Sequence, residues 1–158
     1  MPDYARVIAI IETSEDPDQL RQFMENAKRM EAPNVYEAAF RRLVEILPNE
    51  APEPMAQEFW RAIHGLEQCL REERGKTVRL TRTRQKLDRV GAVKTLADLA
   101  LSATPSEGFE MLIQRDMSDL TAEAVILRHE GEFEAEVVTA ARKRLEAAEA
   151  ANEDEAEA

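Results

Sequence analysis

The residues of this sequence best suited to binding chemistry are nine basic side chains gathered between residues 69 and 94. That segment holds nine of the 21 lysines and arginines and only three acids, although the whole chain has a net charge of -11. Six of the nine are arginines, and a guanidinium can donate two parallel hydrogen bonds to one phosphate. A cluster of this kind is typical of a surface that contacts phosphate groups or another polyanion.

The part of this segment from Val78 to Val90 has the pattern of an amphipathic helix. At 100° per residue, its four main basic side chains fall within an arc of about 80°, beside an apolar arc of similar width. Arg84 lies beyond the far edge of that apolar arc. The predicted phosphate contacts are Arg79, Arg82, Lys86 and Arg89, supported by Arg71, Arg74, Lys76 and Arg84.

This pattern leaves two functions open. The first is a nucleic-acid-associated accessory or regulatory protein that contacts the backbone of DNA or RNA, without sequence-specific readout because no side chain can be assigned to base edges. The second is a helical protein-protein interaction module that docks an acidic partner or self-associates. A plainer interpretation stands beside both, since runs of charge are usually solvated or paired with the protein's own acids.

Catalytic and metal-binding patterns are weak. His64 and His129 are the only histidines, and Cys69 is five residues from His64, a spacing that does not bring two helical side chains together. Neither histidine has a carboxylate three residues earlier, because Arg61 and Ile126 occupy those positions. That excludes the Glu-x-x-His pairs of a carboxylate-bridged metal bundle. We therefore expect a non-enzymatic protein with no cofactor and no metal.

The composition places the protein in a globular class. With 44% hydrophobic and 34% charged residues, the chain can bury a core of its own. A single cysteine forbids an internal disulfide, and no stretch approaches the roughly 20 apolar residues that cross a bilayer. We therefore expect a cytoplasmic protein that does not enter a membrane.

The elements that must position the basic residues are helices. Alanine and leucine are abundant and glycine is scarce, which favours an all-α fold. Helix N-caps are predicted at Asp16, Asn34 and Thr104, and a C-cap at Gly75. The β-branched segment from residue 3 to residue 12 has no strand to pair with, so we expect it to be helical as well. The prolines from Pro48 to Pro54 predict a turn.

These signals predict a compact multi-helix bundle that begins with a helical hairpin. Residues 1–47 form the N-terminal hairpin region, and residues 54–145 form a C-terminal bundle that contains the basic helix. We expect one continuous core, because 47 residues alone would be marginally stable. Residues 146–158 hold six acids and no base, which predicts a fraying acidic tail. Such a tail would compete with a polyanion for the basic segment.

Overall fold

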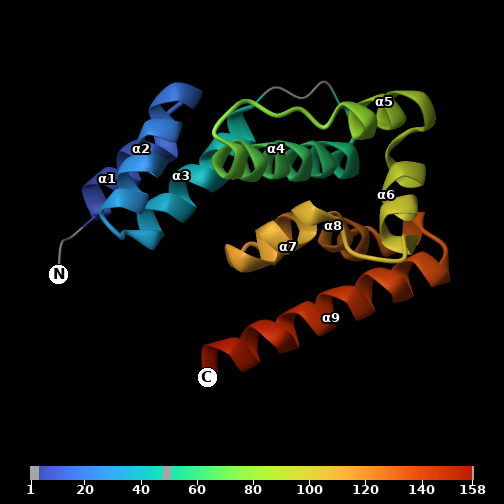
Figure 1. Ribbon diagram of the computed structural model, residues 1–158. Helices are drawn as coiled ribbons and strands as arrows, with labels where there is room; N and C mark the ends of the chain where they lie inside the picture. The colour runs from blue at the N-terminus through green and yellow to red at the C-terminus, as the bar shows by residue number, and fades with distance from the viewer. Residues whose placement is uncertain (1–3, 48–50, 158) are drawn as a thin grey trace. The chain divides into compact units, whose positions relative to one another are not determined.

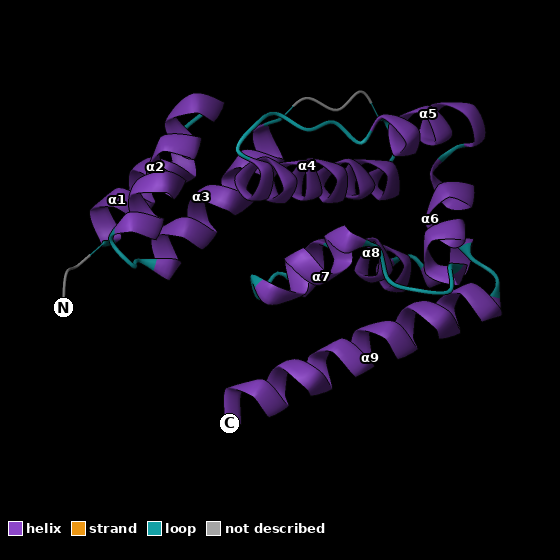
Figure 2. Cartoon of the chain, viewed as in Figure 1, coloured by secondary structure: helices purple, strands orange, loops and turns teal. Residues whose placement is uncertain are grey.

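The computed structural model describes residues 4–47 and 51–157, with side chains through Glu153, and every regular element in those ranges is a helix (Figures 1 and 2). The predicted all-α fold is therefore confirmed. The chain divides into two compact units, Met1–Asn49 (unit 1) and Glu50–Ala158 (unit 2). The expectation of one continuous core stays a prediction. Part of the predicted turn from Pro48 to Pro54 lies outside the described residues.

The described part of unit 1, residues 4–47, is a group of three helices in which α3 packs against both α1 and α2. Asp16 caps α2, because its Oδ1 accepts hydrogen bonds from the backbone N–H groups of Asp18 and Gln19. The predicted helical hairpin is confirmed as α2 and α3, and the segment before it is helical as expected. The helices are α1 (Ala5–Thr13), α2 (Pro17–Arg29) and α3 (Pro33–Ile46).

The predicted cap at Asn34 is wrong. Ala32 precedes α3, and Pro33 takes the first helical position. Proline is well suited to that position because its ring fixes a helical φ and its missing N–H has no partner there. Asn34 therefore falls inside the first turn of α3, beyond the place where it would act as a cap.

Unit 2 is built around the long helix α4, which packs against three later helices (Figure 1). In the core of unit 2, Phe59 and Ile63 of α4 pack with Leu96, Val125 and Ile126 from later helices. The helices are α4 (Pro54–Arg74), α5 (Thr81–Val90), α6 (Ala92–Leu101), α7 (Glu107–Gln114), α8 (Ala122–Arg128) and α9 (Ala135–Glu157). Helix α9 lies along α8 and also packs against α6 and α7, which closes the core from a further side.

Glycines mark the two ends of the central part of the basic segment, residues 75–91. Gly75 ends α4 with a φ of 70°, as predicted, and its N–H bonds the carbonyl of Arg71 at 2.8 Å. Gly91 has a φ of 88° and is the only residue between α5 and α6. Both positions lie in the left-handed region that glycine adopts without steric strain. This central part is therefore a loop and a short helix between two glycine turns.

The last two helices of unit 2 differ from the sequence-based expectation. Ser106 caps α7, accepting from the N–H of Phe109 at 3.2 Å, so the cap predicted at Thr104 is wrong. Helix α9 continues to Glu157, so residues 146–157 extend a helix and do not form a separate tail. Alanine and glutamate dominate that stretch, and both favour helix.

Helices α4 and α7 approach closely at Gly108. A Cβ added there would lie 1.9 Å from Cδ1 of Leu66 and within 2.6 Å of its Cγ. Only glycine fits this position without moving Leu66. The close contact between α4 and α7 therefore depends on having glycine, with no side chain, at position 108.

We expect Gly108→Ala to lower the free energy of unfolding of unit 2 by about 1–2 kcal/mol, since the overlap costs more than the helix propensity gained by alanine. Urea unfolding followed by fluorescence of Trp60, the single tryptophan, measures this. In a Leu66→Ala background the same change should be neutral or stabilising. An equal loss in both backgrounds would contradict the steric explanation.

Candidate functional site

The eight basic residues predicted to contact phosphate have different surroundings in the structure. Four have side-chain partners within unit 2, and four are exposed, with side chains that have no ion-pair or hydrogen-bond partner among the described residues. The first group is Arg71, Arg74, Arg84 and Lys86. The second group, which we call the cationic face, is Lys76, Arg79, Arg82 and Arg89.

Arg84 points back onto α4. Its Nε and Nη2 donate to the two carboxylate oxygens of Glu67 at 2.8 and 2.6 Å, and its guanidinium lies 5.0 Å from the centroid of the Trp60 ring. Hydrogen bonding to Glu67 raises the pKa of Arg84 above its usual value. Because Arg84 is engaged in this way, we remove it from the predicted contact set.

Glu67 also explains where α5 begins. Its Oε2 accepts the backbone N–H of Leu80 at 2.8 Å, so one carboxylate holds both the start of α5 and Arg84. Helix α5 starts at Thr81, which leaves Arg79 in the preceding loop. The prediction that Arg79 shares a helical arc with the later basic residues is therefore wrong, although its side chain is exposed.

The other paired cations are held at the surface. Lys86 forms an ion pair with Asp98 of α6, which also accepts from Lys94 at 2.9 Å. The hydrogen bond from Lys86, followed by that from Lys94, lowers the pKa of Asp98. Arg74 contacts Glu107 at 3.4 Å. Exposed pairs of this kind contribute little to stability and exchange readily for another anion.

Arg71 also has a partner at the surface. Its Nη1 donates a hydrogen bond to the hydroxyl of Thr77, in the loop after α4, at 3.2 Å. The partner is a hydroxyl, and no carboxylate of the described residues pairs with the Arg71 charge. Arg71, Arg74 and Lys86 therefore stay as secondary members of the predicted contact set, behind the cationic face.

The cationic face follows the loop before α5 and one side of that helix. Arg82 and Arg89 are seven residues apart, which places them on the same side about 10 Å apart along the axis. Arg79 and Lys76 precede them in the loop between Gly75 and Thr81. Beyond Arg89, at the corner between α5 and α6, the chain exposes two large apolar side chains, Val90 at 41% and Val93 at 40%.

Sequence reasoning missed a buried ion pair at the other side of unit 2. Arg144 of α9 donates to Glu123 of α8 at 3.1 Å and to the carbonyls of Leu99 and Ser102 at 3.0 and 2.7 Å. Burial raises the pKa of Glu123, and the hydrogen bond from Arg144 only partly opposes this. No sequence signal links residues 21 apart on different helices, and Glu123 in the first turn of α8 is also a usual position for a surface acid.

The histidines have separate structural partners. The His64 ring packs 5.7 Å from Trp60, and its Nδ1 lies 3.9 Å from Glu67. His129 contacts Glu58, which Arg128 also contacts. Burial raises the pKa of Glu58, but hydrogen bonds from His129 and Arg128 outweigh that effect and lower it overall. His129 thus connects the end of α8 to α4, whereas the contacts of His64 with Trp60 and Glu67 lie within α4.

No cluster that could hold a metal ion is present among the described side chains, those of residues 4–47 and 51–153. Cys69 is buried. Over the same described ranges, none of the helices combines the length and the hydropathy that crossing a bilayer requires. The expectation of a non-enzymatic protein without a cofactor stays a prediction.

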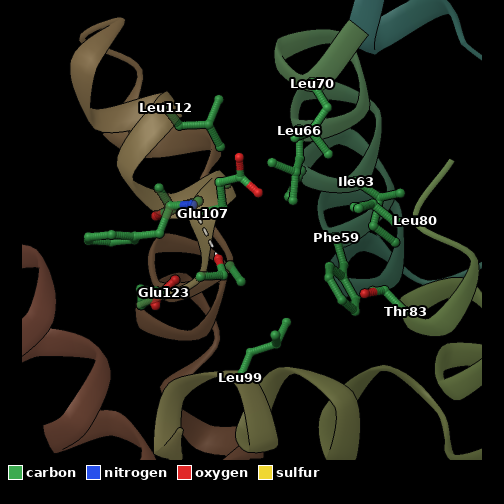
Figure 3. A pocket seen from close by; sticks show the side chains of 16 residues that line it. Phe59, Ile63, Leu66, Leu70, Leu80, Thr83, Leu99, Glu107, Leu112 and Glu123 are labelled. Atoms are coloured by element: carbon green, nitrogen blue, oxygen red, sulfur yellow. Dashed lines mark hydrogen bonds between the residues drawn. The ribbon is translucent and has the colours of Figure 1, made fainter. Parts of the chain in front are cut away.

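A cavity of about 180 Å³ lies inside unit 2 between α4 and α7 (Figure 3). Its walls are mostly apolar, with Phe59, Ile63 and Leu66 on the α4 side and Leu112 on the α7 side. The start of α5 and parts of α6 and α8 complete the lining. No residue pattern predicted this cavity, because it depends on how five helices are spaced.

Comparison of the chain with protein-family models, with curated proteins and with solved structures finds no match. A function for this chain therefore has to be inferred from its residues and their geometry.

Proposed function

We propose that this protein binds the phosphate backbone of a nucleic acid through the cationic face, as an accessory or regulatory protein without catalytic activity. One observation supports this most directly: Lys76, Arg79, Arg82 and Arg89 are exposed and have no partner among the described residues. A cation used for structure is expected to have a partner, as Arg84 has. Four neighbouring cations without one are available to an external anion.

The spacing of the cationic face suits a repeating anion. The separation of about 10 Å along α5 between Arg82 and Arg89 corresponds to about three nucleotide steps of duplex axis at 3.4 Å each. The loop cations Arg79 and Lys76 extend the face beyond the helix N-terminus. Contacts to successive phosphates position a protein on a nucleic acid without reading its sequence.

The net charge of -11 limits the strength of binding and does not forbid it. Charges further than a Debye length, about 8–10 Å, are largely screened at physiological salt. The local surface around α5 therefore decides whether a phosphate is attracted. We expect an affinity in the range of non-specific binding, with a dissociation constant of about 10⁻⁴ to 10⁻⁶ M.

We expect a fourfold rise in salt to weaken duplex binding about fortyfold if three arginines contact phosphates. Fluorescence anisotropy with duplex and single-stranded oligonucleotides measures this, using the full chain and a variant carrying Arg79→Glu, Arg82→Glu and Arg89→Glu. The variant should show no measurable binding even at low salt.

A matched control carries three reversals at other exposed cations, Arg6→Glu, Arg29→Glu and Lys143→Glu, and has the same net charge as the triple variant. It should bind within a few-fold of the parent. If the parent does not bind any oligonucleotide at low salt, or if the control loses as much affinity as the triple variant, the proposal is wrong.

A second candidate is a docking surface for an acidic protein partner, and Val90 and Val93 favour it. Apolar side chains beside a basic face suit a protein surface better than a phosphate backbone. For this candidate, Val90→Ser/Val93→Ser should weaken binding of the partner and leave oligonucleotide binding unchanged. Self-association through the same face would appear as a concentration-dependent mass in sedimentation equilibrium.

A further inference from the structure

The cavity of unit 2 is separate from the cationic face and has features of a small-molecule site. At about 180 Å³, it is much larger than the voids that side-chain packing ordinarily leaves. An apolar cavity of about 150 Å³ is known to accept a molecule of the size of benzene. Sites between the helices of a bundle are also a common location for ligands.

The lining favours a ligand with an apolar body. Phe59, Ile63 and Leu112 are each 2% exposed, so the walls that they form are hydrocarbon. Two of the polar lining groups, Ser106 and Thr121, already have partners, and the Thr83 hydroxyl also lines the cavity. Ser106 accepts from Phe109, the bond drawn as a dashed line in Figure 3, and Thr121 accepts from Ala124.

The entrance lies at the start of α7. Of the lining residues, only Ser106 and Glu107 are exposed, and the others are buried or half-buried. Figure 3 shows the Glu107 side chain directed across the cavity toward Leu66 of α4. A ligand whose body fills the apolar interior would therefore present its head group to Glu107.

The charged side chain that lines this entrance is acidic. Glu107 and Glu123 are the only ionisable residues in the lining, and no lysine, arginine or histidine is among them. Glu123 is paired with buried Arg144. Arg74 contacts Oε2 of Glu107 at 3.4 Å, and the described residues place no partner on Oε1. The Glu107 carboxylate is 62% exposed, so this ion pair is weak and open to a competing donor.

We propose that the cavity binds a small molecule with an apolar body about the size of a benzene ring and a protonated amino group, with the ring against Phe59, Ile63 and Leu112 and the ammonium at Glu107. The apolar walls supply most of the affinity, and Glu107 selects an amine over a carboxylate. This site does not depend on the nucleic-acid proposal, because none of the cationic-face residues lines it.

Three probes of similar size test the proposal: benzylamine, benzyl alcohol and benzoate. Calorimetry on the full chain at neutral pH should rank their affinities in that order. Glu107→Gln should weaken benzylamine binding about fivefold to tenfold and leave benzyl alcohol unchanged. Glu110→Gln, one turn along α7 and outside the lining, is the matched control and should leave all three affinities unchanged.

Two variants locate the ligand by filling the cavity from different helices, Ala62→Leu from α4 and Ala122→Leu from α8. Either one, if it remains folded by circular dichroism, should abolish binding of all three probes. The proposal is overturned if no probe binds at millimolar concentration, if benzoate binds as tightly as benzylamine, or if a folded filling variant binds like the parent. If neither filling variant folds, the Glu107→Gln and Glu110→Gln comparison still decides the matter.

Discussion

Replacing Arg144 with methionine is expected to lower the free energy of unfolding of unit 2 by about 3–5 kcal/mol, the usual cost of leaving a buried charge without its partner. The Arg144 and Glu123 side chains are 12% and 5% exposed. Arg144 also supplies the donors for two carbonyls near the end of α6, those of Leu99 and Ser102. One side chain therefore ties α9 to both α8 and α6, and its loss leaves three acceptors without that donor.

Urea unfolding followed by Trp60 fluorescence reports on unit 2 specifically, since this is the only tryptophan and it lies on α4. The matched control is Arg142→Met on the same helix. Arg142 pairs with Glu130, but those side chains are 46% and 49% exposed. Exposed pairs contribute about 0–1 kcal/mol, so the control should change little. Similar losses in the two variants would contradict a special role for the buried pair.

The loss in the Arg144→Met variant should depend on pH. The folded-state pKa of Glu123 is already raised by burial. The contribution of Glu123 to stability is therefore fully present below the pKa that this carboxyl has in the unfolded chain. It is lost as pH rises through the raised pKa of the folded state. Removing Arg144 removes the interaction that opposes this shift, so the pKa rises further. Relative to the parent, the Arg144→Met variant should show its largest loss of unfolding free energy near pH ~7, and the loss should be smaller near pH ~5.

Adding Glu123→Gln to Arg144→Met tests the same idea from the other side. A neutral amide at position 123 avoids the buried charge, so the double variant should regain part of the stability that Arg144→Met loses at neutral pH. It should also lose most of the pH dependence between the two conditions. A double variant less stable than Arg144→Met would show that the carboxylate is favourable even without its arginine.

Local signals in the sequence predicted most of the secondary structure. The cap at Asp16 and the left-handed end at Gly75 are both confirmed, because each requires only neighbouring residues. The caps at Asn34 and Thr104 were misplaced by two residues each, since proline and serine nearby offered an equally good local start. Boundaries of this kind are decided by small differences between adjacent capping choices.

The roles of individual charges were much harder to predict. Helical periodicity placed Arg84 beyond the far edge of the apolar arc, but it did not reveal that Glu67, 17 residues earlier, accepts hydrogen bonds from its Nε and Nη2. The pairing depends on how the chain turns between α4 and α5. The cavity and the Arg144–Glu123 pair depend likewise on tertiary packing. Spacing identifies which residues share a helix face, and only the fold determines which of them find a partner.

Replacing Arg84 with alanine is expected to lower the free energy of unfolding of unit 2 by about 2–3 kcal/mol, less than for a fully buried pair because its side chain is 25% exposed. Glu67, 12% exposed, would keep only the N–H of Leu80 and the neighbouring His64. The contact with Trp60 would be lost as well, so the native fluorescence should change. Arg84→Lys should recover little, since an ammonium cannot form the two parallel bonds.

Arg82→Ala should give the opposite result, which separates the structural cation of α5 from the exposed one two residues away. Its stability should stay within about 0.5 kcal/mol of the parent, because Arg82 has no partner among the described residues. Its oligonucleotide binding should weaken, with the slope of log affinity against log salt reduced by about one. Arg84→Ala should leave that slope unchanged under conditions where unit 2 remains folded. Equal stability losses in the two variants, or a reduced slope in Arg84→Ala alone, would reverse the assignment of roles on this helix.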